Sequence, residues 1–174
     1  EMRIEFVGPE IVVALVQHRQ LLAGGTHPAI PAELCESAGK GAVEKRINTK
    51  LTDEARKNQC GFKSGTDTLE PGCDKKLKNL ATVLIDAKKQ LDQAGVKSYK
   101  FEVSGHTDST GDAAKNKALS EKRAEVIVKE LVARGVPRSE ILAVGRGSEQ
   151  RLVKPDDTEA KKAKNRRYEI QVRL

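Results

Sequence analysis

Aromatic residues and long apolar runs are both scarce in this sequence. Tryptophan is absent, and three phenylalanines and two tyrosines make up the aromatic 3% of the 174 residues. The core must therefore be built from Leu, Ile, Val and Ala, and a surface that stacks nucleic-acid bases on aromatic rings is disfavoured. The longest apolar run, residues 11–16, is far shorter than the roughly 20 residues that span a bilayer.

Cysteine is also rare, with only Cys35, Cys60 and Cys73. None of them belongs to a CxxC pair or lies near a histidine at the spacing of a metal site, so no metal is expected. In an oxidising compartment two of the three are expected to form a disulfide. We predict that Cys35 pairs with either Cys60 or Cys73, and the alternative is three buried thiols.

The net charge of +7 and the pI of about 9.3 favour an anionic partner, such as nucleic acid, anionic lipid or an acidic polymer. Most basic residues alternate with acidic ones, as in residues 121–125, which is typical of a solvated surface. A short basic cluster at residues 161–167 is equally well explained as a helix surface. The charge alone therefore does not identify the partner, and we expect no nucleic acid.

The chain divides into two parts near residue 54. Residues 1–54 are irregular, with a short strand predicted at 2–7, a helix that begins at Pro9 and a further helix at 33–46. We expect this part to be an extension or a linker. Because the sequence starts without an initiator Met, a membrane anchor upstream of it is expected.

Residues 55–174 have a regular alternation of strand and helix patterns. Apolar residues at steps of three and four indicate helices, and alternation indicates strands. The predicted order is strand 55–62, helix 74–94, strand 98–104, helix 113–134, strand 141–144, helix 158–163 and strand 168–174. This βαβαβ(α)β order predicts an α+β domain with a mixed β-sheet and helices packed on one face.

A polar loop bounded by glycines, residues 105–111, is predicted between a strand and the helix that follows it. The start of a helix offers free backbone N–H groups and the positive end of the helix dipole, which favour a carboxylate. Asp108 lies in this loop as the candidate anion. Asn116, Leu119 and Arg123 recur at steps of three and four, so they share a helix face that can look back toward the loop.

Asp108 and Arg123 together fit a ligand that carries both charges. The carboxylate would receive an ammonium group, and the guanidinium would grip a carboxylate with two hydrogen bonds. A free amino-acid head group has this pair of charges, and so has the distal end of meso-diaminopimelate. The alternative is that Asp108 caps the following turn and pairs internally with Arg123. His106 is interpreted as a structural hydrogen-bonding residue.

The order and spacing of several motifs resemble the OmpA-like domain family. They are Phe62-Lys63-Ser64-Gly65, Leu69-Glu70-Pro71, Gly105-His106-Thr107-Asp108, Leu119-Ser120 with Arg123-Ala124, Gly135-Val136-Pro137 and Asn165-Arg166-Arg167-Tyr168. The resemblance covers about residues 55–174. The Gly-His-Thr-Asp and Asn-Arg-Arg blocks, in this order and at this spacing, are together highly specific.

The resemblance implies non-covalent binding of peptidoglycan stem peptides in the periplasm, without a cofactor. In that family the Asp of the first block receives the amine of diaminopimelate, and the Arg of the Leu-Ser-x-x-Arg-Ala block holds its carboxylate. These positions are Asp108 and Arg123 here. The other residues expected to line the pocket are Asn116, Leu119, Thr107, Ser109 and Thr110. The residues expected to support it are His106, Asn165, Arg166 and Arg167, with one of the arginines a candidate for ligand contact.

The expected role is to anchor a membrane protein or complex to the cell wall, and no catalysis is expected. The parent is left open among a stator subunit similar to the flagellar motor B protein, an outer-membrane barrel and a lipoprotein, and a stator-like parent implies a homodimer. The alternatives are a peptidoglycan-acting enzyme and a basic module that binds nucleic acid or anionic lipid. Lys63 stands where many members of the family have an acidic or small residue. The resemblance therefore does not determine the character of the pocket's outer rim.

Overall fold

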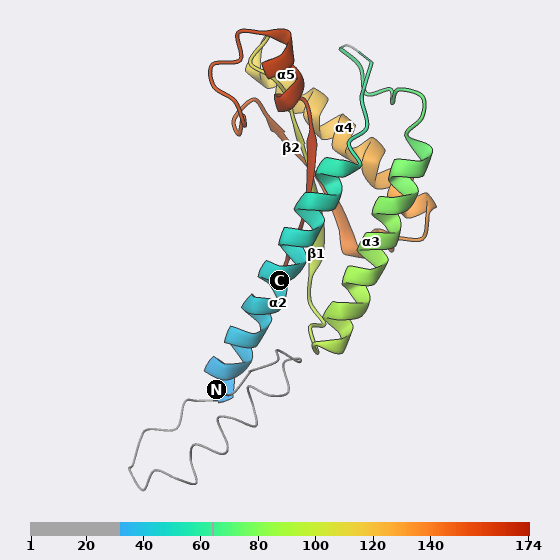
Figure 1. The fold of residues 1–174 in the computed structure, drawn as a ribbon, viewed down its shortest axis with the longest axis vertical. Coiled ribbons are helices and arrows are strands. Elements are labelled where there is room, and N and C mark those ends of the chain that lie inside the picture. Colours follow the sequence, from blue (N-terminus) through green and yellow to red (C-terminus); the bar gives the residue numbers. More distant parts are fainter. Residues whose placement is uncertain (1–31, 64) are drawn as a thin grey trace, which may run out of the picture. The chain divides into compact units, whose positions relative to one another are not determined.

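The structure, a computed structural model, describes residues 32–63 and 65–174. Its helices are α2 (Ala32–Lys57), α3 (Asp74–Gln93), α4 (Ala113–Ala133) and α5 (Glu159–Asn165), with a 3-10 turn at Arg138–Glu140. Its strands are β1 (Lys100–His106), β2 (Ile141–Gly147) and β3 (Tyr168–Arg173). Figure 1 shows their order along the chain. The strand expected at 2–7 and the helix start at Pro9 lie outside the described residues.

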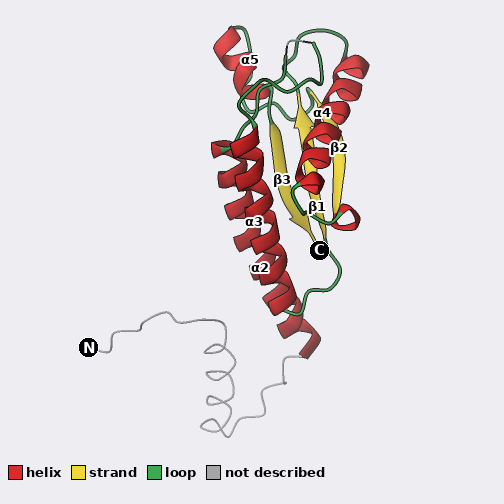
Figure 2. Ribbon diagram, turned by 90° about the vertical axis from the view of Figure 1, so that its right-hand side faces the viewer, coloured by secondary structure: helices red, strands yellow, loops and turns green. Residues whose placement is uncertain are grey.

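The three strands form a mixed sheet with β1 in the centre. β2 is parallel to β1, with Phe101 opposite Ile141, and β3 is antiparallel to β1, with Val103 opposite Ile170. Figure 2 shows β1 between β3 and β2. The predicted mixed sheet is confirmed, and the carboxyl ends of β1 and β2 lie at the same edge of it.

The two faces of the sheet differ in polarity. Phe101 and Val103 of β1 are fully buried on one face, against which α4 packs across β1 and β2. Between them, Glu102 points to the opposite face, where its carboxylate lies 2.7 Å from the guanidinium of Arg146 and 3.8 Å from that of Arg173. The predicted α+β fold, with helices on one face of the sheet, is therefore confirmed.

α2 shares the core of the sheet domain. Its residues Ile47, Leu51 and Ala55 are buried in one cluster with the apolar residues of α3, α4 and the strands. The side-chain amide of Asn48 also bonds to the backbone of Val172, accepting from its N–H at 2.6 Å and donating to its carbonyl at 3.1 Å. Since β3 is an edge strand, Asn48 satisfies backbone groups that the sheet leaves unpaired.

The strand predicted at 55–62 is wrong. Residues 55–57 are the end of α2, and Phe62 forms only an isolated bridge with Leu69. The helix predicted at 33–46 therefore continues to Lys57, because buried residues recur at steps of four along this segment. The proposed boundary between an extension and a domain falls inside α2 and stays a prediction. The remaining predicted helices and strands are present, with ends shifted by a few residues.

The backbone of α4 lies directly on the sheet at two glycines. A Cβ atom added to Gly105 would lie 2.1 Å from the carbonyl oxygen of Ser120, and one added to Gly145 would lie 2.6 Å from that of Lys117. The hydroxyl of Ser120 also accepts a hydrogen bond of 2.9 Å from the backbone N–H of Gly147. This contact fixes the height and rotation of α4 over the strand ends.

We predict that Gly105→Ala lowers the free energy of unfolding by about 3 kcal/mol, because the added methyl group meets rigid backbone. Urea denaturation measures the loss. The control is Gly41→Ala within α2, where an added Cβ meets nothing within 4 Å. That variant is expected to gain about 0.5–1 kcal/mol from helix propensity. Equal stability of the Gly105→Ala variant and the parent would contradict the close packing.

Candidate functional site

A cleft opens where β1 and β2 end and α4 begins. The loop from Thr107 to Asp112 connects β1 to α4; Gly111 turns it with a φ of 91°, and the side chain of Asp112 accepts from the N–H of Lys115 to cap the helix. Figure 1 shows α5 at this same end of the sheet. The cleft has a volume of about 510 Å³. Its lining residues are Phe62, Gly65, Glu70, Thr107, Asp108, Thr110, Asn116, Leu119, Arg123, Glu159, Lys162 and Arg166.

Asp108 is a buried carboxylate whose two oxygens have different partners. One accepts from the backbone N–H of Thr110 at 2.9 Å, and the other accepts from the guanidinium of Arg166 at 2.9 Å. Burial raises the pKa of Asp108, but these hydrogen bonds and the charge of Arg166 outweigh it and hold the pKa below its usual value. Asp108 is therefore ionised at neutral pH.

Arg123 brings a buried guanidinium from α4 into the cleft. Its Nε donates to the carbonyl of Thr66 at 2.9 Å, and its guanidinium lies 5.0 Å from the ring centre of Phe62, a cation–π distance. Burial and the charge of Arg166 lower the pKa of Arg123, which still remains protonated. Within residues 32–63 and 65–174, no carboxylate lies within 4.0 Å of it and its two Nη groups make no hydrogen bond.

The alternative interpretation had two parts: that Asp108 caps the following turn and that it forms an ion pair with Arg123. The structure agrees with the first part and contradicts the second. Asp108 does accept from a backbone N–H of its own turn, as a capping residue would. Its ion-pair partner is Arg166, however, and not Arg123. The reason is that Arg166, at the end of α5, reaches one oxygen of Asp108, whereas Thr66 and Phe62 hold Arg123.

The structure brings most of the residues predicted to line the pocket to the cleft. Thr107, Thr110, Asn116 and Leu119 all line it, and the amide of Asn116 donates to the carbonyl of Thr110 at 2.9 Å. Ser109 does not line the cleft. Its N–H and hydroxyl instead bind the carboxylate of the buried Asp156, at 2.9 and 2.6 Å.

Of the two arginines predicted to support the site, only Arg166 lines the cleft. Besides Asp108, it pairs with Glu159 of α5. Arg167 instead pairs with Glu169 at 2.7 Å and donates to the carbonyl of Gln150. Arg166 is the C-terminal capping residue of α5 and Arg167 directly precedes β3, and their two side chains contact different parts of the structure.

Asn165 and His106 lie behind the cleft. The side-chain oxygen of Asn165 accepts from the N–H groups of Leu152 and Val153, and its amide donates to Asp156, so it ties together the segment before α5. His106 is 1% exposed, and its Nε2 lies 3.3 Å from the hydroxyl of Ser104. Burial and the nearby charge of Arg167 lower the pKa of His106 to about 4, so it is neutral at pH 7.

Sequence reasoning missed part of the charge in the cleft. Glu159 and Lys162 stand three residues apart on α5 and line the cleft, as does Glu70. The spacing of Glu159 and Lys162 did not indicate a binding site, because charged residues at helical spacing are common on any exposed helix. Lys63, in contrast, is exposed and is not among the lining residues.

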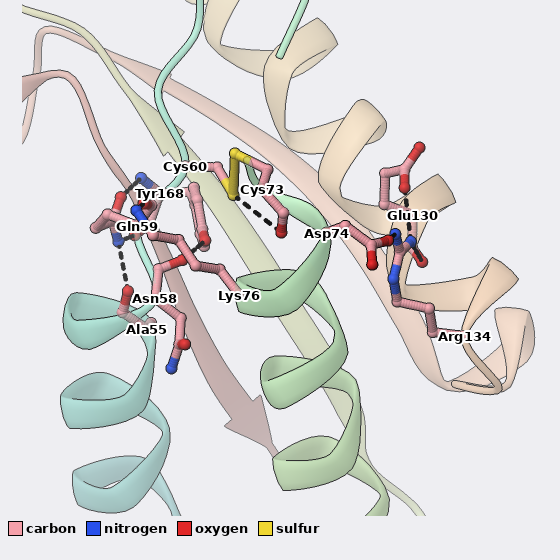
Figure 3. The surroundings of a disulfide bond; sticks show 10 residues. All are labelled: Ala55, Asn58, Gln59, Cys60, Cys73, Asp74, Lys76, Glu130, Arg134 and Tyr168. Carbon is pink, nitrogen blue, oxygen red and sulfur yellow. Dashed lines mark hydrogen bonds and ion pairs between the residues drawn. A yellow bond between two sulfur atoms is a disulfide. The ribbon is translucent and has the colours of Figure 1, made fainter. Parts of the chain in front are cut away.

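A disulfide closes the loop that forms one wall of the cleft. Cys60 and Cys73 are bonded, with Cα atoms 5.5 Å apart (Figure 3). The prediction that Cys35 is one of the partners is therefore wrong. Cys60 follows the end of α2 and Cys73 precedes α3, and the chain between them turns back on itself at the Phe62–Leu69 bridge, so its ends meet. Spacing in the sequence does not show this turn.

The segment between the cysteines, called the 61–72 loop, holds Arg123 in place. It supplies the ring of Phe62 and the carbonyl of Thr66, and Gly65 and Glu70 complete its side of the cleft. Backbone hydrogen bonds within the loop run from Glu70 to Gly61 and from Lys63 to Thr68, both at 2.9 Å. The disulfide thus fixes the base of a small hairpin whose tip contacts the guanidinium.

Asp108 and Arg123 have opposite charges and line one cleft at the carboxyl ends of the parallel strands β1 and β2. The protein is therefore an α+β domain with a charged cleft. The OmpA family matches residues 61–166, which is more than half of the chain, and the chain belongs to this family. In the described residues, no helix is both long and apolar enough to cross a membrane. No group of His, Cys, Asp and Glu suited to a metal ion occurs among them either.

Two curated proteins illustrate the sequence similarity. Outer membrane porin F of Pseudomonas fluorescens is 51% identical over 71 residues, which are 41% of this chain and 22% of the porin. The peptidoglycan-binding protein ArfA of Mycobacterium tuberculosis is 43% identical over 70 residues, which are 40% of this chain and 21% of ArfA. The chain therefore matches about a fifth of the length of these relatives.

Two solved structures illustrate the similarity of fold. The peptidoglycan-associated lipoprotein of Burkholderia pseudomallei aligns with a TM-score of 0.54 and 26% identity, over 66% of this chain and 89% of the lipoprotein. The periplasmic domain of Helicobacter pylori MotB aligns with a TM-score of 0.54 and 20% identity, over 65% of this chain and 69% of that domain. At this identity the second likeness shows the fold alone.

We predict that replacing both Cys60 and Cys73 by serine lowers the free energy of unfolding by about 3 kcal/mol, the value expected for a disulfide that closes a loop of this size. Urea denaturation under non-reducing conditions measures it. The matched control is Cys35→Ser, which is expected to unfold like the parent. A larger loss in the Cys35→Ser variant than in the double variant would show that the pairing is different.

We predict that His106 makes the protein less stable as the pH falls from about 6.5 to about 4. Its folded pKa lies below its ordinary value, so in this window the unfolded chain binds a proton that the folded chain does not. The free energy of unfolding should fall by up to about 1.4 kcal/mol per pH unit. His106→Gln should flatten this slope in urea titrations between pH 7.5 and 4.5. An unchanged slope would contradict the assignment.

Proposed function

We propose that this chain binds peptidoglycan non-covalently by holding the zwitterionic end of a diaminopimelate residue in the cleft. The observation that carries the proposal is Arg123, a buried guanidinium without a carboxylate partner in the described residues, which lines the same cleft as the carboxylate of Asp108. A buried charge is costly unless it is paired. A ligand carboxylate would supply the missing partner.

In the proposed complex, the carboxylate of diaminopimelate accepts hydrogen bonds from the two Nη groups of Arg123. The geometry favours this because Thr66 and the ring of Phe62 already hold the guanidinium, so little side-chain freedom is lost on binding. The ammonium group donates to Asp108. A carboxylate offers about four acceptor positions, of which Thr110 and Arg166 occupy two.

The remaining lining residues would shape the pocket around the aliphatic part of the ligand. Leu119 offers an apolar contact, and Asn116 and Thr107 offer polar ones. The hydroxyl of Thr107 is buried and has no hydrogen-bond partner among the described residues. Ser109, His106 and the supporting residues behind the cleft are proposed to keep the loop in place.

The names of two similar proteins support this proposal. One relative is a peptidoglycan-binding protein and one structural neighbour is a peptidoglycan-associated lipoprotein. We infer that the chain acts in the periplasm as a module that anchors a membrane protein or complex to the cell wall, by binding and without catalysis. If the parent is stator-like, the module is expected to work as a homodimer.

We predict that Asp108→Asn and Arg123→Ala each weaken the binding of meso-diaminopimelate at least about 30-fold, since removing one partner of a buried charge pair costs about 2 kcal/mol or more. Isothermal titration calorimetry measures the affinity, and sedimentation with purified sacculi tests the intact polymer. Lysine, which lacks the distal carboxylate, should bind parent and Arg123→Ala protein equally weakly.

The matched controls are Asp92→Asn at the exposed end of α3 and Arg173→Ala at the end of β3 away from the cleft. Both change charge by the same amount as the test variants and are expected to bind like the parent. If the Asp108→Asn and Arg123→Ala proteins bind diaminopimelate and sacculi as tightly as the parent, the proposed function is wrong.

A further inference from the structure

A second hollow lies between the end of α2, α5 and the start of β3, with a volume of about 340 Å³. We call it the α2–α5 groove. Its lining residues are Thr52, Ala55, Arg56, Gln59, Cys60, Gly61, Leu152, Ala163, Lys164, Arg166, Arg167, Tyr168 and Glu169. Much of this lining is apolar, and Leu152 is 55% exposed, whereas most large apolar side chains of the described residues are buried.

The groove carries an excess of positive charge. Among its lining residues, Arg167 is paired with Glu169, and Arg166 is paired with residues of the cleft. Arg56 and Lys164 are exposed, and neither has a carboxylate within 4.0 Å in the described part of the chain. Two unneutralised cations therefore border an apolar floor.

A smaller cavity of about 260 Å³ lies beside both the groove and the Asp108 cleft. This cavity shares Phe62, Glu70 and Arg123 with the cleft, and Gly61, Ala163 and Arg167 with the groove. Arg166 lines all three. The three hollows thus lie next to one another around Arg166, so a chain-like ligand anchored at Arg123 that extends past Arg166 reaches the groove.

We propose that the α2–α5 groove binds the acidic, alanine-containing part of the same stem peptide whose diaminopimelate occupies the cleft; this inference rests on the proposed function. A stem peptide presents small methyl groups beside carboxylates, including that of the glutamate next to diaminopimelate. The apolar floor fits the methyl groups, and Arg56 and Lys164 fit the glutamate carboxylate. The groove would therefore distinguish a stem peptide from free diaminopimelate.

The test compares two probes, meso-diaminopimelate and the soluble tripeptide L-Ala-γ-D-Glu-diaminopimelate, by calorimetry on the whole chain. The test variant is the double substitution Arg56→Glu and Lys164→Glu. Because exposed ion pairs contribute little each, its affinity for the tripeptide is expected to fall about three- to tenfold. Its affinity for diaminopimelate should stay unchanged.

A double variant with the same change of net charge, Lys75→Glu with Lys129→Glu, serves as the control, since both lysines are exposed on α3 and α4 and line none of the three hollows. It should bind both probes like the parent. Amidating the glutamate carboxylate of the tripeptide should weaken binding to the parent by the same factor and leave the Arg56→Glu, Lys164→Glu variant unaffected.

The inference is overturned if the parent binds the tripeptide no more tightly than diaminopimelate, or if the Arg56→Glu, Lys164→Glu variant binds the tripeptide like the parent. Either result leaves the proposed function standing as long as diaminopimelate binds in the cleft. A parent protein that binds neither probe would instead refute the proposed function itself.

Discussion

The contact between the backbone of α4 and the backbone of the sheet determines the geometry of the site. The carbonyl of Ser120 lies where the Cβ of any residue other than glycine at position 105 would be, and Gly145 permits the same approach on β2. Because α4 lies this close to the sheet, its first turns are next to the loop that follows β1. Arg123, one turn beyond Ser120 on the same helix, is thereby brought to the cleft that Asp108 also lines.

In this placement the two arginines of the cleft have different partners. Arg166 neutralises Asp108, while Arg123 is held by a carbonyl and an aromatic ring and keeps its Nη groups without partners in the described residues. The 61–72 loop, closed at its base by the disulfide, fixes the groups that hold Arg123.

The chain belongs to the OmpA family, and it shares its fold with a peptidoglycan-associated lipoprotein and with a periplasmic domain of MotB. The chain spans between about a fifth and about half of the length of the curated relatives it matches. In this chain the cleft, built at the ends of the strands, depends on the sheet and on α4. The groove beside α5 depends on the end of α2, which lies outside the matched segment 61–166.

The sequence by itself determined the elements from residue 74 onward, the α+β class and the candidate pair Asp108 and Arg123, because periodicity and local motifs report on neighbours along the chain. It did not determine that Arg166 pairs with Asp108, that Cys60 bonds to Cys73, or that the segment after residue 55 continues a helix. Each of these depends on segments that meet only after folding. Only the tertiary structure decides which charges remain unpaired, because partners are chosen by distance in space.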